Sequence, residues 1–227
     1  MHKVYYYNIK FWRAEVLRAG LFLQGIPFDN VTDREQLQAI KPKAPFGALP
    51  IMELPDGKIL SQTQAMAAYV GKLGSIFEHG KDDEFSIPPY SRLYPLDSDY
   101  LGQARCDEII NGCTDVTNTV AVTMRLPDPE ETKAKRLALL DPSTGRLVMH
   151  LSGLESLVCL DAEDFACGTN LTVADLCVWR LVGWLSGGNL DHIQSDFVSS
   201  NFPKLHGIYT AVQENEHMIE YVKKYHN

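Results

Sequence analysis

The sequence predicts a protein of two parts, an α/β N-terminal domain and an all-α C-terminal helical bundle domain. Three observations support this division. Residues 1–75 alternate between strand-like and helix-like segments, a tract rich in Gly, Pro and charge follows, and no convincing strand pattern appears after Asp97. We therefore expect an N-terminal domain at 1–75, a linker at 76–95 and a helical domain at 96–227.

The N-terminal elements are expected in the order β-α-β-α-β-β-α. An aromatic, β-rich run opens the chain, and the first helix has apolar residues at helical spacing and ends at Gly25. Pro55-Asp56-Gly57 is turn chemistry for a hairpin. The expected ranges are 3–7, 12–24, 26–31, 33–40, 49–54, 58–60 and 62–73. A helix between two strands implies a parallel pair and the hairpin adds an antiparallel edge, which together give a thioredoxin-like topology.

The C-terminal domain reads as helices separated by breakers. These are Pro127, Pro129, Pro142, Gly168 and Pro203. One helix start is marked by Thr172-Val173-Ala174-Asp175, which has the spacing of a capping box with Asp at its third helical position. We assign this motif a structural role.

Composition excludes several classes of protein. A formal charge of -8 argues against a nucleic-acid surface, and an anionic ligand would need locally placed cations. The cysteines are odd in number and form no CxxC pair, which favours reduced thiols over disulfides or a zinc site. No apolar run is long enough to span a membrane. We expect a cytoplasmic protein with no metal, no membrane and no nucleic-acid partner.

The loop after the first strand is where a thioredoxin-like fold places its reactive group. No Ser or Cys occurs before Ser61, so disulfide exchange chemistry is excluded there, and the nearby hydroxyls are three consecutive tyrosines. Strand alternation puts Tyr6 on one face and Tyr5 with Tyr7 on the other. The tyrosines can serve either as strand packing or as a donor to a ligand.

Two further segments can bind a ligand through the main chain. Leu49-Pro50 is a candidate cis bond that would offer the Leu49 main chain to an extended peptide, or else a trans bond that ends a loop. Gln62 and Thr63 open the third helix, whose N-terminus suits a carboxylate. The simpler alternative is that Ser61 or Thr63 is an N-cap.

Five segments, in order along nearly the whole chain, resemble the sigma-class cytosolic glutathione transferases. They are Tyr6-Tyr7-Asn8 with Arg13-Ala14-Glu15, then 45–50 (PFGALP), 61–66 (SQTQAM), 168–175 and 201–205 (NFPKL). The sequence departs from the family pattern at four places. The 8–13 loop has one extra residue, and Phe11-Trp12 replaces its glycine-containing turn. Ala48 replaces the usual Gln or Lys, and the tryptophan expected near 35–37 is missing.

The resemblance implies a set of roles. Tyr6 would be catalytic, polarising the glutathione thiol, with Tyr7 as the alternative. Asp115 would reach across a homodimer to the glutathione amino group, or else be an exposed acid on a helix. The residues implied for glutathione are Arg13, Lys41, Ala48, Leu49, Pro50, Gln62, Thr63 and Asp115, with Arg13 and Lys41 for the glycyl carboxylate. Helix position alone suggests an electrophile pocket walled by Phe11, Trp12, Met124 and Arg125.

The resemblance also implies a function. We expect a detoxifying glutathione transferase that conjugates the thiolate to small hydrophobic electrophiles, with glutathione as co-substrate and no other cofactor. Two alternatives stay open, a glutathione-dependent isomerase similar to the prostaglandin D synthases, and a non-catalytic crystallin-like or ligand-binding relative.

Overall fold

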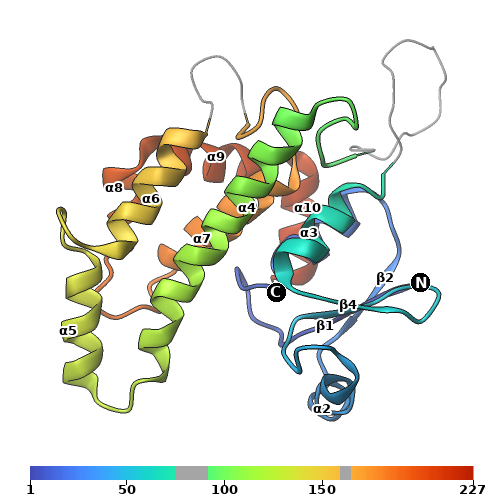
Figure 1. Cartoon of the computed structure of the whole chain (residues 1–227), viewed down its shortest axis with the longest axis horizontal. Coiled ribbons are helices and arrows are strands. Elements are labelled where there is room, and N and C mark those ends of the chain that lie inside the picture. The colour runs from blue at the N-terminus through green and yellow to red at the C-terminus, as the bar shows by residue number, and fades with distance from the viewer. Residues whose placement is uncertain (75–91, 159–164, 227) are drawn as a thin grey trace.

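The computed structural model describes residues 1–74, 92–158 and 165–226. The expected linker at 76–95 lies mostly outside these ranges, and so does Cys159. The N-terminal part holds a four-stranded sheet in the order β2-β1-β3-β4 (Figure 1). β1 pairs parallel with β2 and antiparallel with β3, and β3 pairs antiparallel with β4. The predicted thioredoxin-like topology is confirmed.

Most N-terminal elements are shorter than the sequence indicates, and they keep the expected order. Their bounds are β1 His2–Tyr5, α1 Glu15–Leu23, β2 Phe28–Val31, α2 Arg34–Ile40, η1 Lys41–Lys43, β3 Ile51–Glu53, β4 Ile59–Ser61 and α3 Thr63–Gly71. β1 ends at Tyr5 instead of Tyr7 because the carbonyls of Tyr6 and Tyr7 accept hydrogen bonds from buried Arg18. α1 starts at Glu15 instead of Trp12 because the Glu15 carboxylate accepts the Phe11 N–H and fixes a turn.

The two faces of the sheet are covered differently. Tyr5 and Ile51 pack with Leu37 and Ile40 of α2 in a small cluster on one face. The other face packs on α1 and α3 and continues into the main core, which extends into the helical part. Figure 1 shows α2 on one side of the sheet and α3 on the other.

The C-terminal part is helical, as predicted. Its elements are α4 Tyr100–Ala121, η2 Val122–Arg125, α5 Pro129–Leu139, α6 Arg146–Leu157, α7 Val173–Leu185, α8 Phe197–Asn201, α9 Pro203–Glu214 and α10 Glu216–Tyr225. Pro129 and Pro203 begin helices, since the first helical position needs no N–H donor. α7 is its central helix, because every one of its residues is buried.

The capping box at the start of α7 is confirmed. The Asp175 carboxylate accepts the Thr172 N–H at 2.8 Å and also the Ala166 N–H at 2.6 Å. Asp175 is fully buried, and burial raises the pKa of its carboxyl to about 6 while these hydrogen bonds act in the opposite direction. Asp175 therefore fastens the preceding loop to the central helix.

The structure bears on two expectations from composition, the state of the cysteines and the presence of a membrane-spanning helix. Every cysteine of the described ranges is a free thiol, namely Cys106, Cys113, Cys167 and Cys177. No helix in the described ranges has both the length and the apolar character needed to cross a bilayer.

Candidate functional site

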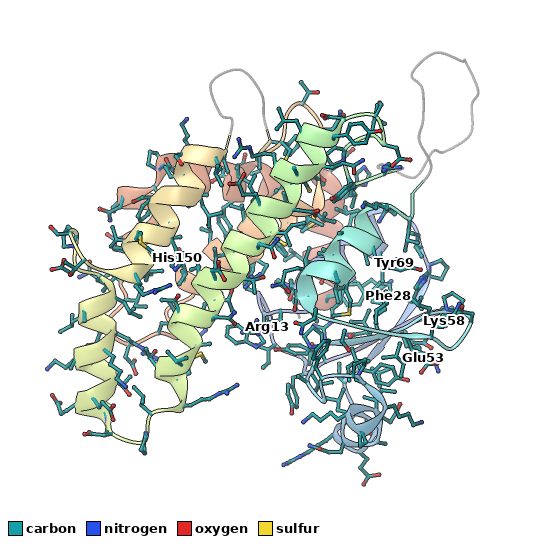
Figure 2. All side chains as sticks on the ribbon, viewed as in Figure 1. Arg13, Phe28, Glu53, Lys58, Tyr69 and His150 are labelled. Carbon is teal, nitrogen blue, oxygen red and sulfur yellow. The ribbon has the colours of Figure 1, made fainter. Side chains whose placement is uncertain are left out.

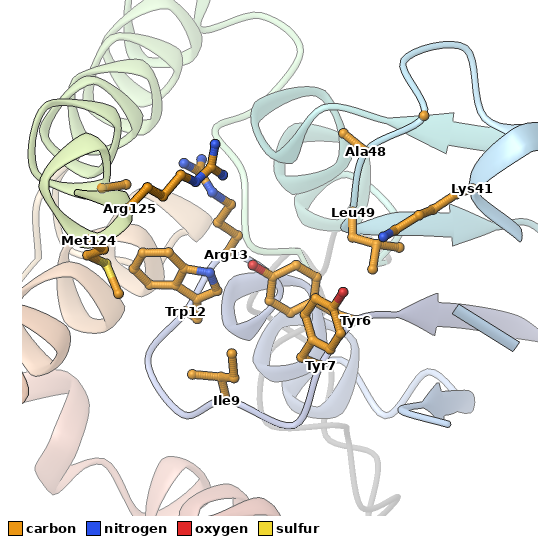
Figure 3. A pocket seen from close by; sticks show the side chains of 12 residues that line it. Tyr6, Tyr7, Ile9, Trp12, Arg13, Lys41, Ala48, Leu49, Met124 and Arg125 are labelled. Atoms are coloured by element: carbon orange, nitrogen blue, oxygen red, sulfur yellow. The ribbon is translucent and has the colours of Figure 1, made fainter. Parts of the chain in front are cut away.

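Two adjoining cavities open where the α/β part meets the helical part. The larger has a volume of about 490 Å³ and is shown in Figure 3. Its lining residues are Tyr6, Tyr7, Ile9, Trp12, Arg13, Lys41, Gly47, Ala48, Leu49, Ala121, Met124 and Arg125. The smaller, about 280 Å³, is lined by Arg13, Phe46, Ala48, Leu49, Pro50, Ser61, Gln62, Thr63, Gln64, Thr114, Asn118 and Arg125. Four residues, Arg13, Ala48, Leu49 and Arg125, line both cavities.

Tyr6 lies at the floor of the larger cavity, directly after β1. Its side chain is only 4% exposed, yet its hydroxyl makes no hydrogen bond to a described residue and is not among the fully buried unpartnered atoms. The phenol is therefore embedded with its oxygen still open to the cavity. Burial raises the pKa of Tyr6 to about 12, although the charges of Arg13, Arg180 and Arg18 lower it. The phenol is thus a proton donor at any physiological pH.

Tyr7 packs edge-on against Tyr6, with ring centroids 5.7 Å apart, and is 39% exposed. Figure 3 shows the two rings between Arg13 and Lys41. The strand-alternation argument separated Tyr6 from Tyr7, and the structure does give the two rings very different burial. Both tyrosines nevertheless line the larger cavity.

Of the two alternatives for Leu49–Pro50, the structure shows the cis bond, immediately before β3. Neither main-chain group of Leu49 makes a backbone hydrogen bond within the described residues. Leu49 lines both cavities, so its N–H and C=O provide an open edge beside them. An extended peptide can pair with such an edge as an added strand.

The start of α3 faces the smaller cavity. Gln62 occupies the N-cap position with φ of 72° and makes no capping hydrogen bond, so the alternative of a Ser61 or Thr63 cap is not what the structure shows. A non-glycine residue in this left-handed region is uncommon and concentrates at functional sites. The first amides of α3, including that of Thr63, are left for a ligand, and the helix dipole favours an anion there.

Arg13 lies between the two parts of the molecule (Figure 2). Its guanidinium donates to Asn118 Oδ1 of α4 at 2.9 Å and lies 5.7 Å from the centre of the Trp12 ring. Burial lowers the pKa of Arg13, and the charge of Tyr6 opposes that effect. Arg13 is therefore close to the Tyr6 phenol, on the opposite side of the larger cavity from Lys41 in Figure 3.

Most of the residues expected at the site are brought together, with two exceptions. Phe11 lines neither cavity. Its ring packs 4.9 Å from Trp179 and 5.0 Å from His226, with φ of 55°, so its expected place in the electrophile pocket is corrected to the interior. Trp12 takes the cavity side of the loop and packs 4.5 Å from Trp184. Asp115 is exposed on α4 and does not line the cavities of its own chain.

Sequence reasoning missed several lining residues. Thr114 and Asn118 lie one turn apart on α4 and both face the smaller cavity, which a helical i, i+4 pattern beside Asp115 would have indicated. Ile9 and Ala121 carried no motif signal, whereas Phe46, Gly47 and Gln64 lie in the 45–50 and 61–66 segments but were assigned no role. In the described ranges no three His, Cys, Asp or Glu side chains gather in a way that suits a metal ion.

This is a two-domain thioredoxin-like protein with a ligand cleft between its sheet and its helices. Residues 114–225 match the family described as "Glutathione S-transferase, C-terminal domain". A glutathione S-transferase of Anopheles gambiae is 25% identical over 98% of this chain and 96% of its own length. Glutathione S-transferase 1 of Ascaris suum is 27% identical over 82% of this chain and 81% of its own.

The fold has solved counterparts as well. The structure of prostaglandin synthase D of Nilaparvata lugens matches with a TM-score of 0.73 and 19% identity, over 99% of this chain and 98% of the other. Fold, order of elements and sequence matches agree. The chain belongs to the glutathione transferase family.

Proposed function

We propose that the protein conjugates the glutathione thiolate to small hydrophobic electrophiles, with Tyr6 as the catalytic group. The observation that carries this proposal is the Tyr6 hydroxyl, held at the floor of the larger cavity beside Arg13 with no partner in the described chain. The open Leu49 main chain and the uncapped start of α3 border the adjoining cavity. These are the features that a bound peptide with a thiol would use.

The chemistry follows from the protonation state of Tyr6. A thiol has a pKa near 8.5, and a hydrogen bond to its charged form contributes about 1.5–3 kcal/mol, which lowers that pKa by one to two units. Tyr6, whose pKa is about 12, stays protonated and donates this bond. The thiol proton goes to water. The sulfur then forms a bond to the electrophilic carbon while the leaving group departs from that carbon.

The proposal orients glutathione along the two cavities, with one of its carboxylates at each end. Its γ-glutamyl carboxylate is placed at the α3 amides of Gln62 and Thr63, and its central residue pairs with the Leu49 main chain. Its glycyl carboxylate is placed at Lys41, beside Ala48. Arg13 was expected to share that carboxylate, but its proximity to Tyr6 supports a role beside the sulfur instead.

The test uses two neighbouring substitutions of the same kind. Tyr6→Phe is expected to lower the conjugation rate of 1-chloro-2,4-dinitrobenzene by about tenfold or more while retention on glutathione resin is kept, since only the donor to sulfur is lost. Tyr7→Phe is the matched control and is expected to change the rate less than twofold. Equal losses in both variants, or no loss in Tyr6→Phe, would remove Tyr6 from its role.

We also propose a homodimer in which Asp115 of one copy completes the glutathione site of the other. Phe46 supports this, because its ring is 64% exposed at the edge of the smaller cavity, where a second copy would cover it. The free thiols of the described chain support a reducing, cytoplasmic location.

The second candidate function is a glutathione-dependent isomerase, which the name of the Nilaparvata lugens neighbour supports. Assay with a prostaglandin endoperoxide beside the chlorinated nitrobenzene separates the two activities. Glutathione binding without turnover of either compound would instead support the non-catalytic reading.

A further inference from the structure

The cleft is strongly cationic although the chain as a whole is acidic. The lining of the larger cavity includes Arg13, Lys41 and Arg125 and no Asp or Glu, whereas the formal charge of the chain is -8. None of the three cations forms an ion pair with a described residue. A local concentration of unpaired charge of one sign draws ligands of the opposite sign.

Arg13 and Arg125 come from different parts of the molecule and meet over the cavities. Arg13 follows β1, Arg125 ends η2, and Figure 3 shows their guanidinium groups next to each other. Both residues line both cavities. The Arg125 guanidinium makes no hydrogen bond to any described residue, whereas the Arg13 guanidinium is already held by Asn118. Two like charges at close range repel each other, and an anion placed between or beside them relieves the repulsion.

Glutathione alone does not account for every positive group at the cleft. Under the proposed function its two carboxylates are met by the α3 amides and by Lys41, and its sulfur lies at Tyr6 and Arg13. Arg125 is then left on the helical side of the larger cavity. Beside it lie Met124 and the Trp12 indole, which provide an apolar wall.

We propose that the second substrate is an amphipathic electrophile that carries an anionic group, such as a carboxylate, and that Arg125 binds this group. The inference rests on the proposed function and narrows its substrate class. Met124 and Trp12 hold the apolar body, and Arg125 holds the anion at the mouth of the cavity. A planar guanidinium suits a carboxylate because it donates two parallel hydrogen bonds.

The experiment compares 4-chloro-3-nitrobenzoate with its methyl ester. In both, the glutathione sulfur bonds to the ring carbon, the carbon–chlorine bond breaks and chloride leaves. The two compounds share the reacting carbon and the leaving group, but they differ in charge and in intrinsic reactivity. Each kcat/KM is divided by the rate constant of the uncatalysed reaction with glutathione. We expect the wild-type protein to favour the benzoate by about tenfold, the change that ~1.4 kcal/mol produces.

Arg125→Gln is expected to abolish this preference by raising KM for the benzoate about tenfold, with less than twofold change for the ester or for glutathione. Arg146→Gln is the matched control, because Arg146 is exposed on α6, bonds to His150 and lines neither cavity. Figure 2 labels His150 on that helix. The control is expected to leave both rates unchanged.

Several results would overturn the inference. One such result is a wild-type protein with no preference for the benzoate. Another is an Arg125→Gln variant that loses kcat/KM equally for both compounds. Either result would mean that Arg125 acts on glutathione, on the reacting sulfur or in contact with a second copy. Conjugation of the ester by the wild type tests the proposed function separately. If neither compound is turned over, the inference can still be tested by calorimetric titration of the glutathione-loaded protein with 4-methyl-3-nitrobenzoate and with its methyl ester. The inference requires that the carboxylate bind more tightly than the ester.

Discussion

The environment of the Tyr6 side chain determines both its chemistry and its effect on stability. The ring is almost fully buried, but its hydroxyl faces the cavity, so the folded protein holds the phenol in a place that disfavours its charged form. Arg13 and Arg18 reduce that penalty without removing it. The result is a neutral donor beside positive groups, an arrangement that favours an anionic sulfur over an anionic oxygen.

The raised pKa of Tyr6 leads to a pH-dependent stability. Unfolded tyrosine has a pKa near 10 and folded Tyr6 about 12, so the folded state binds the proton more tightly and loses free energy of unfolding as pH rises from 10 to 12. The loss at pH 11 is on the order of 1 kcal/mol from this group. Denaturant titrations at pH 9 and pH 11 should show that the free energy of unfolding falls less between these two pH values in Tyr6→Phe than in Tyr7→Phe. Identical declines would contradict the assignment.

At the scale of elements, the end of α10 holds the loop that carries the site. Buried Glu15 accepts the Phe11 N–H at 3.0 Å, the Tyr221 hydroxyl at 2.5 Å and a bond from His226 at 2.8 Å. Glu15 begins α1, whereas Tyr221 and His226 lie more than 200 positions later in the sequence, with separations of 206 and 211. The C-terminal helix thereby fixes the turn that points Phe11 inward and leaves Trp12 at the cavity.

Tyr221→Phe should weaken this connection. Glu15 would lose one of its three donors in a buried place, which costs about 1–3 kcal/mol of stability and loosens the 8–13 turn, so the conjugation rate should also fall. Tyr209→Phe is the control, because Tyr209 also lies near Phe11 but its hydroxyl has no bond in the described chain. Thermal unfolding and turnover, measured together, check both effects. A Tyr221→Phe protein as stable and active as the control would show that the connection is unimportant.

The start of α7 provides a second prediction about an element. Asp175→Ala leaves the Thr172 and Ala166 amides without an acceptor inside the core, and should lower the free energy of unfolding by about 2–4 kcal/mol. Asp128→Ala removes the exposed N-cap of α5, where water replaces the lost bond, and should cost about 1 kcal/mol or less. Urea titration measures the free energy of unfolding of both variants. Equal losses in the two would contradict the role of burial at Asp175.

Elements and site differ in how far the sequence predicts them. Hydrophobic spacing and turn residues predict the order of elements, because both are local. The structure shows the cis alternative at Leu49–Pro50, and the expected cavity positions of Tyr6, Trp12 and Met124 agree with it. The inward turn of Phe11 was not predictable, since it depends on His226 and Trp179, which are distant in sequence.

At the scale of the whole molecule, the cleft exists only because the two parts pack together. The sheet side supplies Tyr6 and the Leu49 edge, and the helical side supplies Met124 and Arg125. Asp115 does not reach the cleft of its own chain, so its expected role requires a second copy related by symmetry. This dependence can be tested with mixed dimers.

Asp115→Asn should raise KM for glutathione if its carboxylate pairs with the glutathione amino group, and Tyr6→Phe should lower turnover. When the two impaired variants are unfolded and refolded together in equal amounts, half of the dimers are mixed. Each mixed dimer then pairs the intact Tyr6 of one copy with the intact Asp115 of the other, so about a quarter of all sites are complete. Activity at low glutathione should therefore rise well above the mean of the two variants. If Asp115 acted within its own chain, every site would keep a defect and the mixture would equal that mean, because no exchange of subunits can then restore a site.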